Sequence, residues 1–351
     1  MRQRLGLAGQ LLARAASGLD RAVTLAIRVA LPTGESEPDL GTGHEARMHA
    51  LRTVEARMSA LELERFFPEP RAIEPLERER GALGSGLIRR DLAWESRAET
   101  FFPELAVPFN STLENRVALA RSFARKAPRP LAILVHGYML GQLAVEERVW
   151  PIRELDALGF DTALYVLPFH GRRASPGHSG RPQFPGLEPR FAMEGFRQAV
   201  TDLRELTRYF RERGHAKVGL LGMSLGGYTA ALTATVDSSL DFLAPIVPLA
   251  SLADFALEQG ELPEAPEPRA LEHALRERVY RHVSPVHRTP LIAPERVLVI
   301  GAKADRITPI SHAKRLASHF RAELVALPGS HMFQWGRAEV LGKLGKWAKP
   351  S

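Results

Sequence analysis

One pentapeptide, Gly222-Met223-Ser224-Leu225-Gly226, limits the possible folds of this chain more than any other feature, because of what flanks it. Residues 217–221 before it form a short apolar run of strand length, and residues 227–234 after it form a small-residue run typical of a helix. A serine on a sharp strand-to-helix turn projects its hydroxyl from the edge of a sheet, and flanking glycines let the backbone turn tightly beside neighbouring strands. The pattern therefore predicts a serine presented at the edge of an α/β sheet.

Short apolar or β-branched runs alternate with helical stretches from about residue 85 onward. The predicted strands cover residues 87–94, 116–123, 131–136, 161–166, 217–222, 243–249, 296–301 and 322–327. The predicted helices cover residues 143–158, 188–213, 225–237, 309–319 and 333–347. Such alternation predicts βαβ units, and strands that are apolar on both faces predict a mostly parallel sheet with helices on both sides.

The first 84 residues follow a different pattern. Residues 4–30 carry leucines and other apolar residues interleaved with arginines, which predicts a basic amphipathic helix. A turn-rich linker follows at residues 32–43, and residues 44–66 predict a second helix. We therefore expect a helical N-terminal extension over residues 1–84 and a single α/β domain over residues 85–351. The first helix either docks on the protein's own surface, contacts a membrane surface or a partner, or serves as a mitochondrial-type presequence.

Two insertions interrupt the alternation, at residues 168–187 and at residues 251–288. Both leave predicted strands at their carboxyl ends, where ligands bind in open α/β sheets, so both are expected to wall or cover a site. The second insertion has an acidic, proline-rich stretch followed by an arginine-rich helix, and we expect it to form a small cap. The first insertion carries a basic group that predicts either contact with an anion or membrane interface, or a loop pinned by hydrogen bonds: His170, Arg172, Arg173 and His178.

A serine hydroxyl is a weak nucleophile until a base takes its proton, and an acid must hold that base in place. Ser224, Asp305 and His331 supply a nucleophile, an acid and a base in this chain order. Asp305 follows the apolar run 297–300, so we expect it at the same edge of the sheet as Ser224. His331 lies in the loop after the last predicted strand, a position from which an imidazole can reach over the serine.

Other acids and histidines fit these roles less well. Asp241 precedes its predicted strand and so belongs to the opposite edge of the sheet, whereas Asp254 falls in the first turn of a helix in the second insertion. Asp305 itself has the alternative role of capping the turn before the next helix. His312 and His319 lie within one predicted helix and are expected to serve in packing or on the surface.

The tetrahedral intermediate of acyl transfer needs backbone N–H groups directed at its oxyanion. We expect one from Leu225, at the start of a helix whose dipole helps. The second is expected from the loop after the strand 131–136, with Tyr138 as the donor and Met139 as the alternative. His136 in this loop is interpreted as a structural hydrogen-bonding residue.

Together these motifs resemble those of the α/β-hydrolase superfamily, in its esterase- and lipase-like branch, over about residues 85–348. The resemblance implies an eight-stranded, mostly parallel sheet, a Ser-Asp-His triad, and hydrolysis of a small-molecule acyl ester, a thioester or an amide without a cofactor. The serine at the turn argues against dehalogenase-like members, which have a carboxylate there. Two alternatives keep the fold: an acyltransferase with the same triad, and a non-catalytic module that binds a membrane or a partner.

Composition limits the other classes of function. The chain has 351 residues and no cysteine, which excludes disulfides, thiol nucleophiles and thiolate metal sites. No metal or cofactor is expected, because metal-ligand spacings and glycine-rich phosphate loops are absent from the sequence. The net charge is +7, but the arginines are spread along the chain without a nucleic-acid-binding motif, so no nucleic-acid partner is expected. No run of 18 apolar residues occurs, so no membrane-spanning helix is expected. Because the absence of cysteine fits a reducing compartment and the basic N-terminus lacks the apolar core of a secretory signal, we expect a cytoplasmic protein, or one peripheral to a membrane through residues 4–30.

Overall fold

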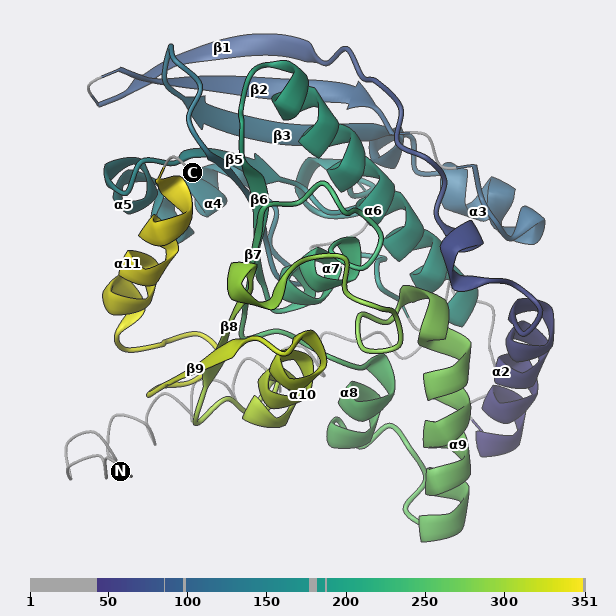
Figure 1. Ribbon diagram of the computed structural model, residues 1–351. Coiled ribbons are helices and arrows are strands. Elements are labelled where there is room, and N and C mark those ends of the chain that lie inside the picture. Colours follow the sequence, from purple (N-terminus) through teal and green to yellow (C-terminus); the bar gives the residue numbers. More distant parts are fainter. Residues whose placement is uncertain (1–42, 85, 97–98, 177–181, 187, 350–351) are drawn as a thin grey trace.

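The apolar runs of the sequence form the strands of one large, twisted sheet (Figure 1). The structure, a computed structural model, describes residues 43–349 except 85, 97–98, 177–181 and 187, so the predicted helix at residues 4–30 lies outside it. The strands are β1 (Leu76–Leu83), β2 (Leu87–Glu95), β3 (Val117–Ala124), β4 (Leu131–Val135), β5 (Asp161–Tyr165), β6 (Val218–Met223), β7 (Phe242–Ile246), β8 (Leu298–Ala302) and β9 (Glu323–Leu327). Their order is β1-β2-β3-β5-β4-β6-β7-β8-β9. The strands from β5 to β9 in this order pair in parallel, whereas β1, β2, β3 and β5 pair antiparallel.

All eight predicted strands are confirmed, but the sheet in the described part of the chain has a ninth strand. The additional strand, β1, was expected to belong to a helical extension. Its sequence, Leu76-Glu77-Arg78-Glu79-Arg80, is charged on both faces, because β1 is an edge strand exposed to solvent. A strand without apolar alternation gives no sequence signal. The boundary predicted after residue 84 stays a prediction, and β1 favours placing it nearer the N-terminus.

Most helices follow the predicted pattern, but the helix predicted over 44–66 ends at Met58, and the short helix at Ala106–Asn110 was not predicted. They are α2 (His44–Met58), α3 (Ala106–Asn110), α4 (Leu143–Val149), α5 (Ile152–Ala157), α6 (Pro189–Glu212), α7 (Leu225–Thr233), α8 (Leu252–Glu258), α9 (Pro266–Val279), α10 (Ile310–Phe320) and α11 (Arg337–Ala348). The single helix predicted over 143–158 is divided into α4 and α5. Pro151 lies at the break, because the residue before a proline avoids helical geometry and proline cannot donate a helical hydrogen bond.

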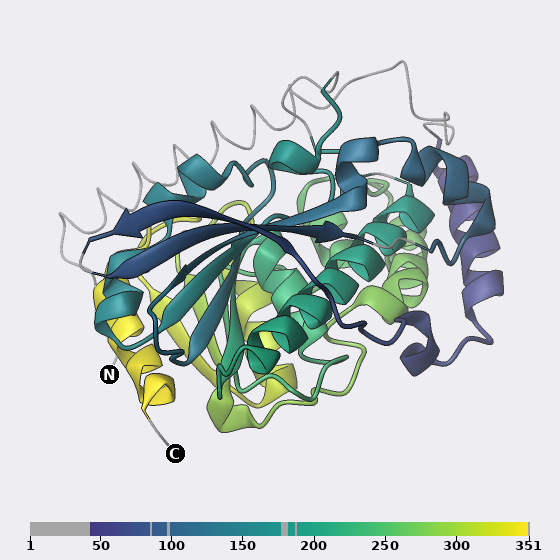
Figure 2. The same ribbon diagram turned by 90° about the horizontal axis from the view of Figure 1, so that it is seen from above.

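Helices cover both faces of the sheet and create two hydrophobic cores. One core packs α2, α6, α7, α9 and α10 against the sheet, and the other packs α4, α5 and α11 against the opposite face. Figure 2 shows the two layers on either side of the strands. Strands β4 to β8 are buried along almost their whole length, which explains their continuously apolar sequences.

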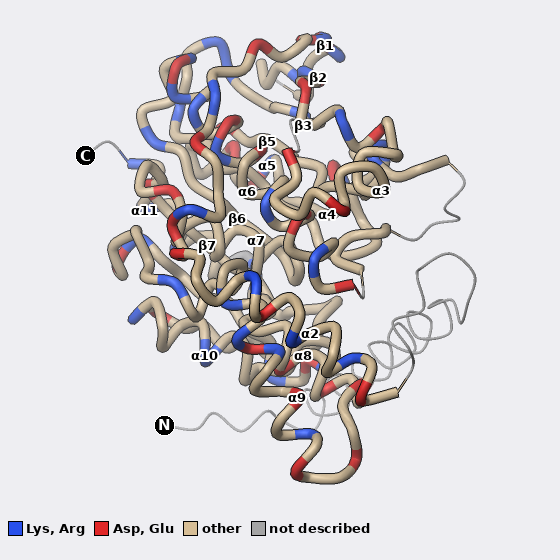
Figure 3. The backbone as a smooth tube through the Cα atoms, turned by 90° about the vertical axis from the view of Figure 1, so that its right-hand side faces the viewer, with Lys and Arg blue, Asp and Glu red and all other residues tan. Residues whose placement is uncertain are grey.

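Helix α2, the first helix of the described residues, is linked to α9 of the second insertion by hydrogen bonds to a buried carboxylate. Glu272 on α9 accepts hydrogen bonds from His44 Nδ1 at 2.8 Å, Arg47 Nε at 3.0 Å and Arg276 Nη2 at 2.9 Å. Charged residues of both signs lie on α2 and α9 where these helices run side by side (Figure 3). Burial alone would raise the pKa of Glu272, but its hydrogen bonds with Arg47, His44 and Arg276 outweigh burial and lower the pKa from 4.5 to about 2.

Replacing Glu272 by Gln should reduce stability at pH 7 by about 1–3 kcal/mol, because the partner cations lose their anion. The lowered pKa in the folded state means that this stabilisation is present above pH 4.5 and is lost as the pH falls toward 2. The measurement is Tm against pH for the wild type and Glu272→Gln, whose difference should shrink below pH 4.5. Glu267→Gln, an exposed change on the same helix, is the control. A difference in Tm that stays constant with pH would contradict the interpretation.

Candidate active site

Ser224 occupies the sharp turn between β6 and α7 that the pentapeptide predicts. Its backbone has φ 56° and ψ −117°, a strained conformation for a residue other than glycine, and its side chain does not cap the helix. The flanking glycines are sterically required. A Cβ built on Gly222 would lie 2.1 Å from the carbonyl oxygen of Gly226, and one built on Gly226 would lie 2.1 Å from that of Val135. The turn therefore fits only because both glycines lack side chains.

The loop after β4 lies directly against Ser224. A Cβ built on Gly137 would lie 3.3 Å from Ser224 Cβ, and the N–H of Ser224 donates to the carbonyl of Ile246 at 2.9 Å. Leu225 begins α7, and the first N–H groups of a helix have no acceptor within it. The structure thus brings Ser224, Leu225 and the 136–139 loop together at the carboxyl edge of the sheet.

Both ring nitrogens of His136 are used to shape this loop. Its Nε2 accepts a hydrogen bond from the N–H of Leu167 at 3.0 Å, so its Nδ1 carries the proton and donates to the carbonyl of Gly137 at 2.8 Å. Burial lowers the pKa of His136 to about 4, which keeps the ring neutral. The structural role expected for His136 is confirmed by these contacts.

The two predicted donors from this loop lie in a turn. The N–H of Leu140 donates to the carbonyl of Gly137 at 3.3 Å, and Met139 has a positive φ of 63°. Tyr138 stays the predicted second oxyanion donor, and Met139 stays the alternative.

Asp305 and His331 are brought into direct contact. His331 Nδ1 lies 2.8 Å from Asp305 Oδ2, and both residues are buried. The other carboxylate oxygen of Asp305 accepts hydrogen bonds from the N–H groups of Ile307 at 2.9 Å and Thr308 at 2.8 Å. Asp305 therefore caps its turn and also contacts His331, whereas its role as the acid of a triad stays a prediction.

Thr308 is a site residue that sequence reasoning missed. Its Oγ1 lies 3.0 Å from His331 Nδ1 and 3.1 Å from Asp305 Oδ2. In the sequence, the Thr308-Pro309 pair indicated only the start of a helix. No local sequence pattern predicts that the Thr308 hydroxyl contacts His331, because His331 lies 23 residues away in the chain.

The rival acids and histidines have other partners. Asp241 accepts from the N–H of Val218 at 2.9 Å, at the amino end of the strands as expected. His312 contacts Glu258 at 2.7 Å, and His319 contacts a backbone carbonyl at 2.8 Å. These histidines serve in packing between elements, as predicted.

Asp254, the second candidate for the acid, belongs to a separate ionic cluster. It lies 2.9 Å from His273, and among the described residues these two and Glu277 form the group whose spacing suits a metal ion. Arg315 contacts both carboxylates and already supplies a positive charge there. Arg315 therefore offsets one of the two negative charges of the cluster.

The basic loop at residues 170–173 is ordered by internal hydrogen bonds, in agreement with one of its two predicted roles. Arg173 is completely buried and donates to Asp202 at 2.9 Å and to the carbonyl of Val166 at 2.9 Å. Arg172 is exposed, and His178 lies outside the described residues.

This basic loop also supports the loop beside Ser224. A Cβ built on Gly171 would lie 2.2 Å from the carbonyl oxygen of Gly141, and the rings of His170 and His136 are 5.1 Å apart. Burial lowers the pKa of His170 well below its ordinary value, so its ring is neutral. The basic loop therefore packs against the predicted oxyanion loop, and His170 contributes a neutral ring to this contact.

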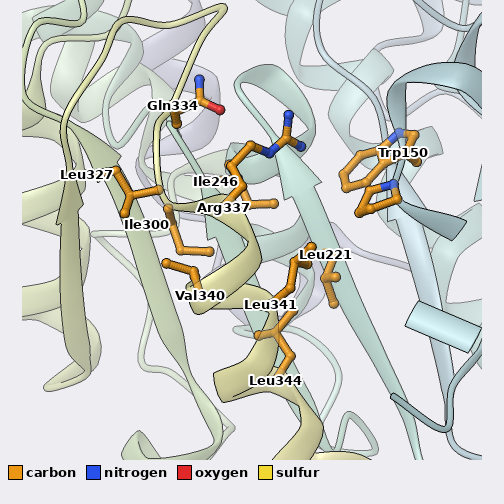
Figure 4. A pocket seen from close by; sticks show the side chains of 11 residues that line it. Trp150, Leu221, Ile246, Ile300, Leu327, Gln334, Arg337, Val340, Leu341 and Leu344 are labelled. Carbon is orange, nitrogen blue, oxygen red and sulfur yellow. The ribbon is translucent and has the colours of Figure 1, made fainter. Parts of the chain in front are cut away.

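A narrow, mostly apolar pocket lies between α11 and the sheet, close to the loop that carries His331 (Figure 4). Gln334 lines it and donates through Nε2 to the carbonyl of Ser330 at 2.9 Å and to that of His331. Gln334 therefore fastens the backbone of the His331 loop. The remaining walls are mainly side chains from β6 to β9, α11 and the residues between α4 and α5, including Trp150, Leu221, Ile246, Ile300, Leu327, Val340 and Leu344.

Two solved structures of similar topology are acetyl xylan esterases. Acetyl xylan esterase 1 from Thermoanaerobacterium sp. JW/SL YS485 matches with a TM-score of 0.56 and 14% identity over 87% of this chain and 94% of that chain. The enzyme from Paenibacillus sp. R4 matches with a TM-score of 0.57 and 16% identity over 91% of this chain and 97% of that chain. The chain has the α/β-hydrolase fold. The fold implied by the sequence motifs is therefore confirmed.

Sequence relatives of this chain are described as uncharacterised. Residues 192–339 match the model of Uncharacterised protein family (UPF0227). Two uncharacterised Mycobacterium tuberculosis proteins, one from strain CDC 1551 / Oshkosh and one from strain ATCC 25618 / H37Rv, are each 33% identical over 208 residues, which is 58% of this chain. The chain spans about half the length of the curated relatives it matches. None of the described helices is both long enough and apolar enough to span a bilayer.

Proposed function

We propose that this α/β-hydrolase is a serine hydrolase that cleaves a carboxylic ester or thioester through an acyl-enzyme. The observation that carries the proposal is the 2.8 Å contact between His331 Nδ1 and Asp305, at the sheet edge where Ser224 occupies a strained turn. Residues held in strained backbone conformations gather at functional sites. The similar solved structures are described as acetyl xylan esterases, which supports ester hydrolysis.

In the proposed mechanism, Ser224 Oγ attacks the acyl carbonyl while His331 takes its proton. Nδ1 of His331 faces Asp305, so Nε2 is the nitrogen that accepts the proton. Asp305 fixes the tautomer of the ring and stabilises the imidazolium. The N–H groups of Leu225 and Tyr138 hold the oxyanion, and water then releases the acyl group from Ser224.

Exposed apolar side chains beside the site favour an ester with an apolar part. Met139, in the loop against Ser224, is 43% exposed, and Met332 and Phe333, directly after His331, are 44% and 56% exposed. Large apolar side chains that stay exposed together commonly mark a binding surface. We therefore expect kcat/KM for p-nitrophenyl octanoate to exceed that for p-nitrophenyl acetate.

The test is covalent labelling of the purified chain with a fluorophosphonate, followed by turnover of a series of p-nitrophenyl esters. We expect one label per chain and ester turnover that stops when the label is bound. Because fluorophosphonates react with activated serines, an unlabelled chain that also leaves all esters intact would contradict the proposal. A preference for acetate over octanoate would contradict only the apolar part of the substrate.

A further inference from the structure

The backbone after β7 is held in an unfavourable conformation. Val247 has φ 40°, which is rare for a β-branched residue because its side chain crowds the backbone there. Its N–H donates to the carbonyl of Ile300 at 2.7 Å, and its own carbonyl accepts from Thr308 Oγ1 at 2.9 Å. A conformation of this kind persists only where surrounding contacts hold it, and the Thr308 hydroxyl is one of those contacts.

Thr308 Oγ1 also contacts both members of the acid–base pair. It lies 3.0 Å from His331 Nδ1 and 3.1 Å from Asp305 Oδ2, in a site where Thr308 is 3% exposed. A hydroxyl has one proton, and the carbonyl of Val247 and the carboxylate of Asp305 can both only accept it. The contact with Val247 is the shorter of the two, at 2.9 Å against 3.1 Å, so we assign the proton to Val247. The oxygen of Thr308 then accepts from His331 Nδ1–H, which Asp305 shares.

The turn at Val247 directly follows strand β7, and β7 forms a hydrogen bond with the backbone of Ser224. Ile246, the residue before Val247, accepts the N–H of Ser224 at 2.9 Å. A path of hydrogen bonds and one peptide bond therefore runs from Ser224 through Ile246 and Val247 to Thr308, and from Thr308 to His331.

We propose that Thr308 is a positioning residue for the general base. It shares the Nδ1 proton of His331 with Asp305, and through Val247 it sets the ring relative to the turn that carries Ser224. This inference rests on the proposed serine-hydrolase function. The acid is not displaced when the hydroxyl is removed, because the backbone N–H of Thr308 still donates to Asp305 Oδ1.

Thr308→Val keeps the shape of the side chain and removes only its hydroxyl. We expect kcat per labelled active site to fall by about 10- to 100-fold with little change in KM, since a hydrogen bond that orients the base is lost. The acidic limb of the kcat/KM profile should move to lower pH. The lost hydroxyl accepts a hydrogen bond from His331 Nδ1–H, and losing this acceptor destabilises the protonated ring more than the neutral ring. Thr308→Ser retains the hydroxyl and should restore kcat to within about threefold of the wild type.

The experiment measures kcat and KM from pH 5 to 9, active-site concentration by fluorophosphonate labelling, and Tm, for the wild type and both variants. A purely structural role for Thr308 would lower Tm and the labelled fraction but leave kcat per labelled site and the pH profile unchanged, and that result would overturn the inference. Equal loss in Thr308→Ser and Thr308→Val, with both folded, would overturn it as well.

A readout independent of turnover separates this inference from the proposed function. The proton on His331 Nδ1 gives a downfield ¹H NMR signal when strongly hydrogen-bonded, and His331→Ala identifies it by its disappearance. An upfield shift in Thr308→Val that Thr308→Ser reverses supports the positioning role, whereas an unchanged signal overturns it. If the wild type neither labels nor cleaves esters, the proposed function fails while the NMR result still decides whether Thr308 shares the proton.

Discussion

Replacing Ser224 by Ala should abolish fluorophosphonate labelling and lower kcat for ester hydrolysis by roughly 10⁴-fold or more. The proposed acyl-enzyme needs an oxygen at this position, and an alanine leaves His331 without a proton to take. Rate enhancement from the proposed oxyanion loop and from substrate binding should remain, so turnover should fall far but not to the rate in water. Steady-state kinetics with p-nitrophenyl esters and in-gel detection of the label measure both effects.

The matched control is Ser111→Ala, an exposed serine whose hydroxyl contacts only the nearby carbonyl of Pro108 among the described contacts. It should retain wild-type labelling and turnover. Ser224→Ala should also retain the Tm of the wild type to within a few degrees, because a positive φ costs alanine about as much conformational energy as it costs serine. A folded Ser224→Ala protein with more than a tenth of wild-type kcat would refute Ser224 as the nucleophile.

Much of the fold was predictable because its signals are local. Strands β4 to β8 are short runs that are apolar on both faces, and the glycines around Ser224 report a turn that admits no side chain. Asp305 and His331 follow strand ends at one edge of the sheet, so the order of the elements was enough to bring them together. Among the strands of the described residues only β1 was missed, since an edge strand with charged residues on both faces lacks the apolar alternation that identifies a strand.

Other parts of the site depend on contacts that no local pattern contains. The role of Thr308 follows from a hydroxyl that meets His331 and the carbonyl of Val247, 23 and 61 residues away in the chain. The role of Arg173 was equally open, because the sequence alone does not distinguish an exposed loop arginine from one that is buried against Asp202. Only the tertiary structure distinguishes these alternatives, by fixing which side chains are buried together.

Gly226→Ala should be among the most damaging small substitutions in the chain. The added Cβ would lie 2.1 Å from the carbonyl oxygen of Val135 and 2.4 Å from that of His136, so either β4 or α7 has to move. We expect a loss of about 3 kcal/mol in the free energy of unfolding, at the upper end for overpacking, because backbone atoms rather than flexible side chains oppose the new methyl group. Urea unfolding measures this loss.

The same displacement should also lower activity. Val135 and His136 directly precede Gly137, which packs closely against Ser224: a Cβ built on Gly137 would lie 3.3 Å from Ser224 Cβ. In the fraction of Gly226→Ala that remains folded, kcat per labelled site should therefore fall as well, because a shift of about 1 Å in oxyanion donors costs as much as 100-fold. Gly342→Ala is the control: its Cβ meets nothing within 4 Å in α11, and removing a helical glycine should stabilise the chain by up to about 1 kcal/mol. If Gly226→Ala were as stable and as active as Gly342→Ala, the result would contradict the view that close packing of the glycines around Ser224 positions the serine against the loop.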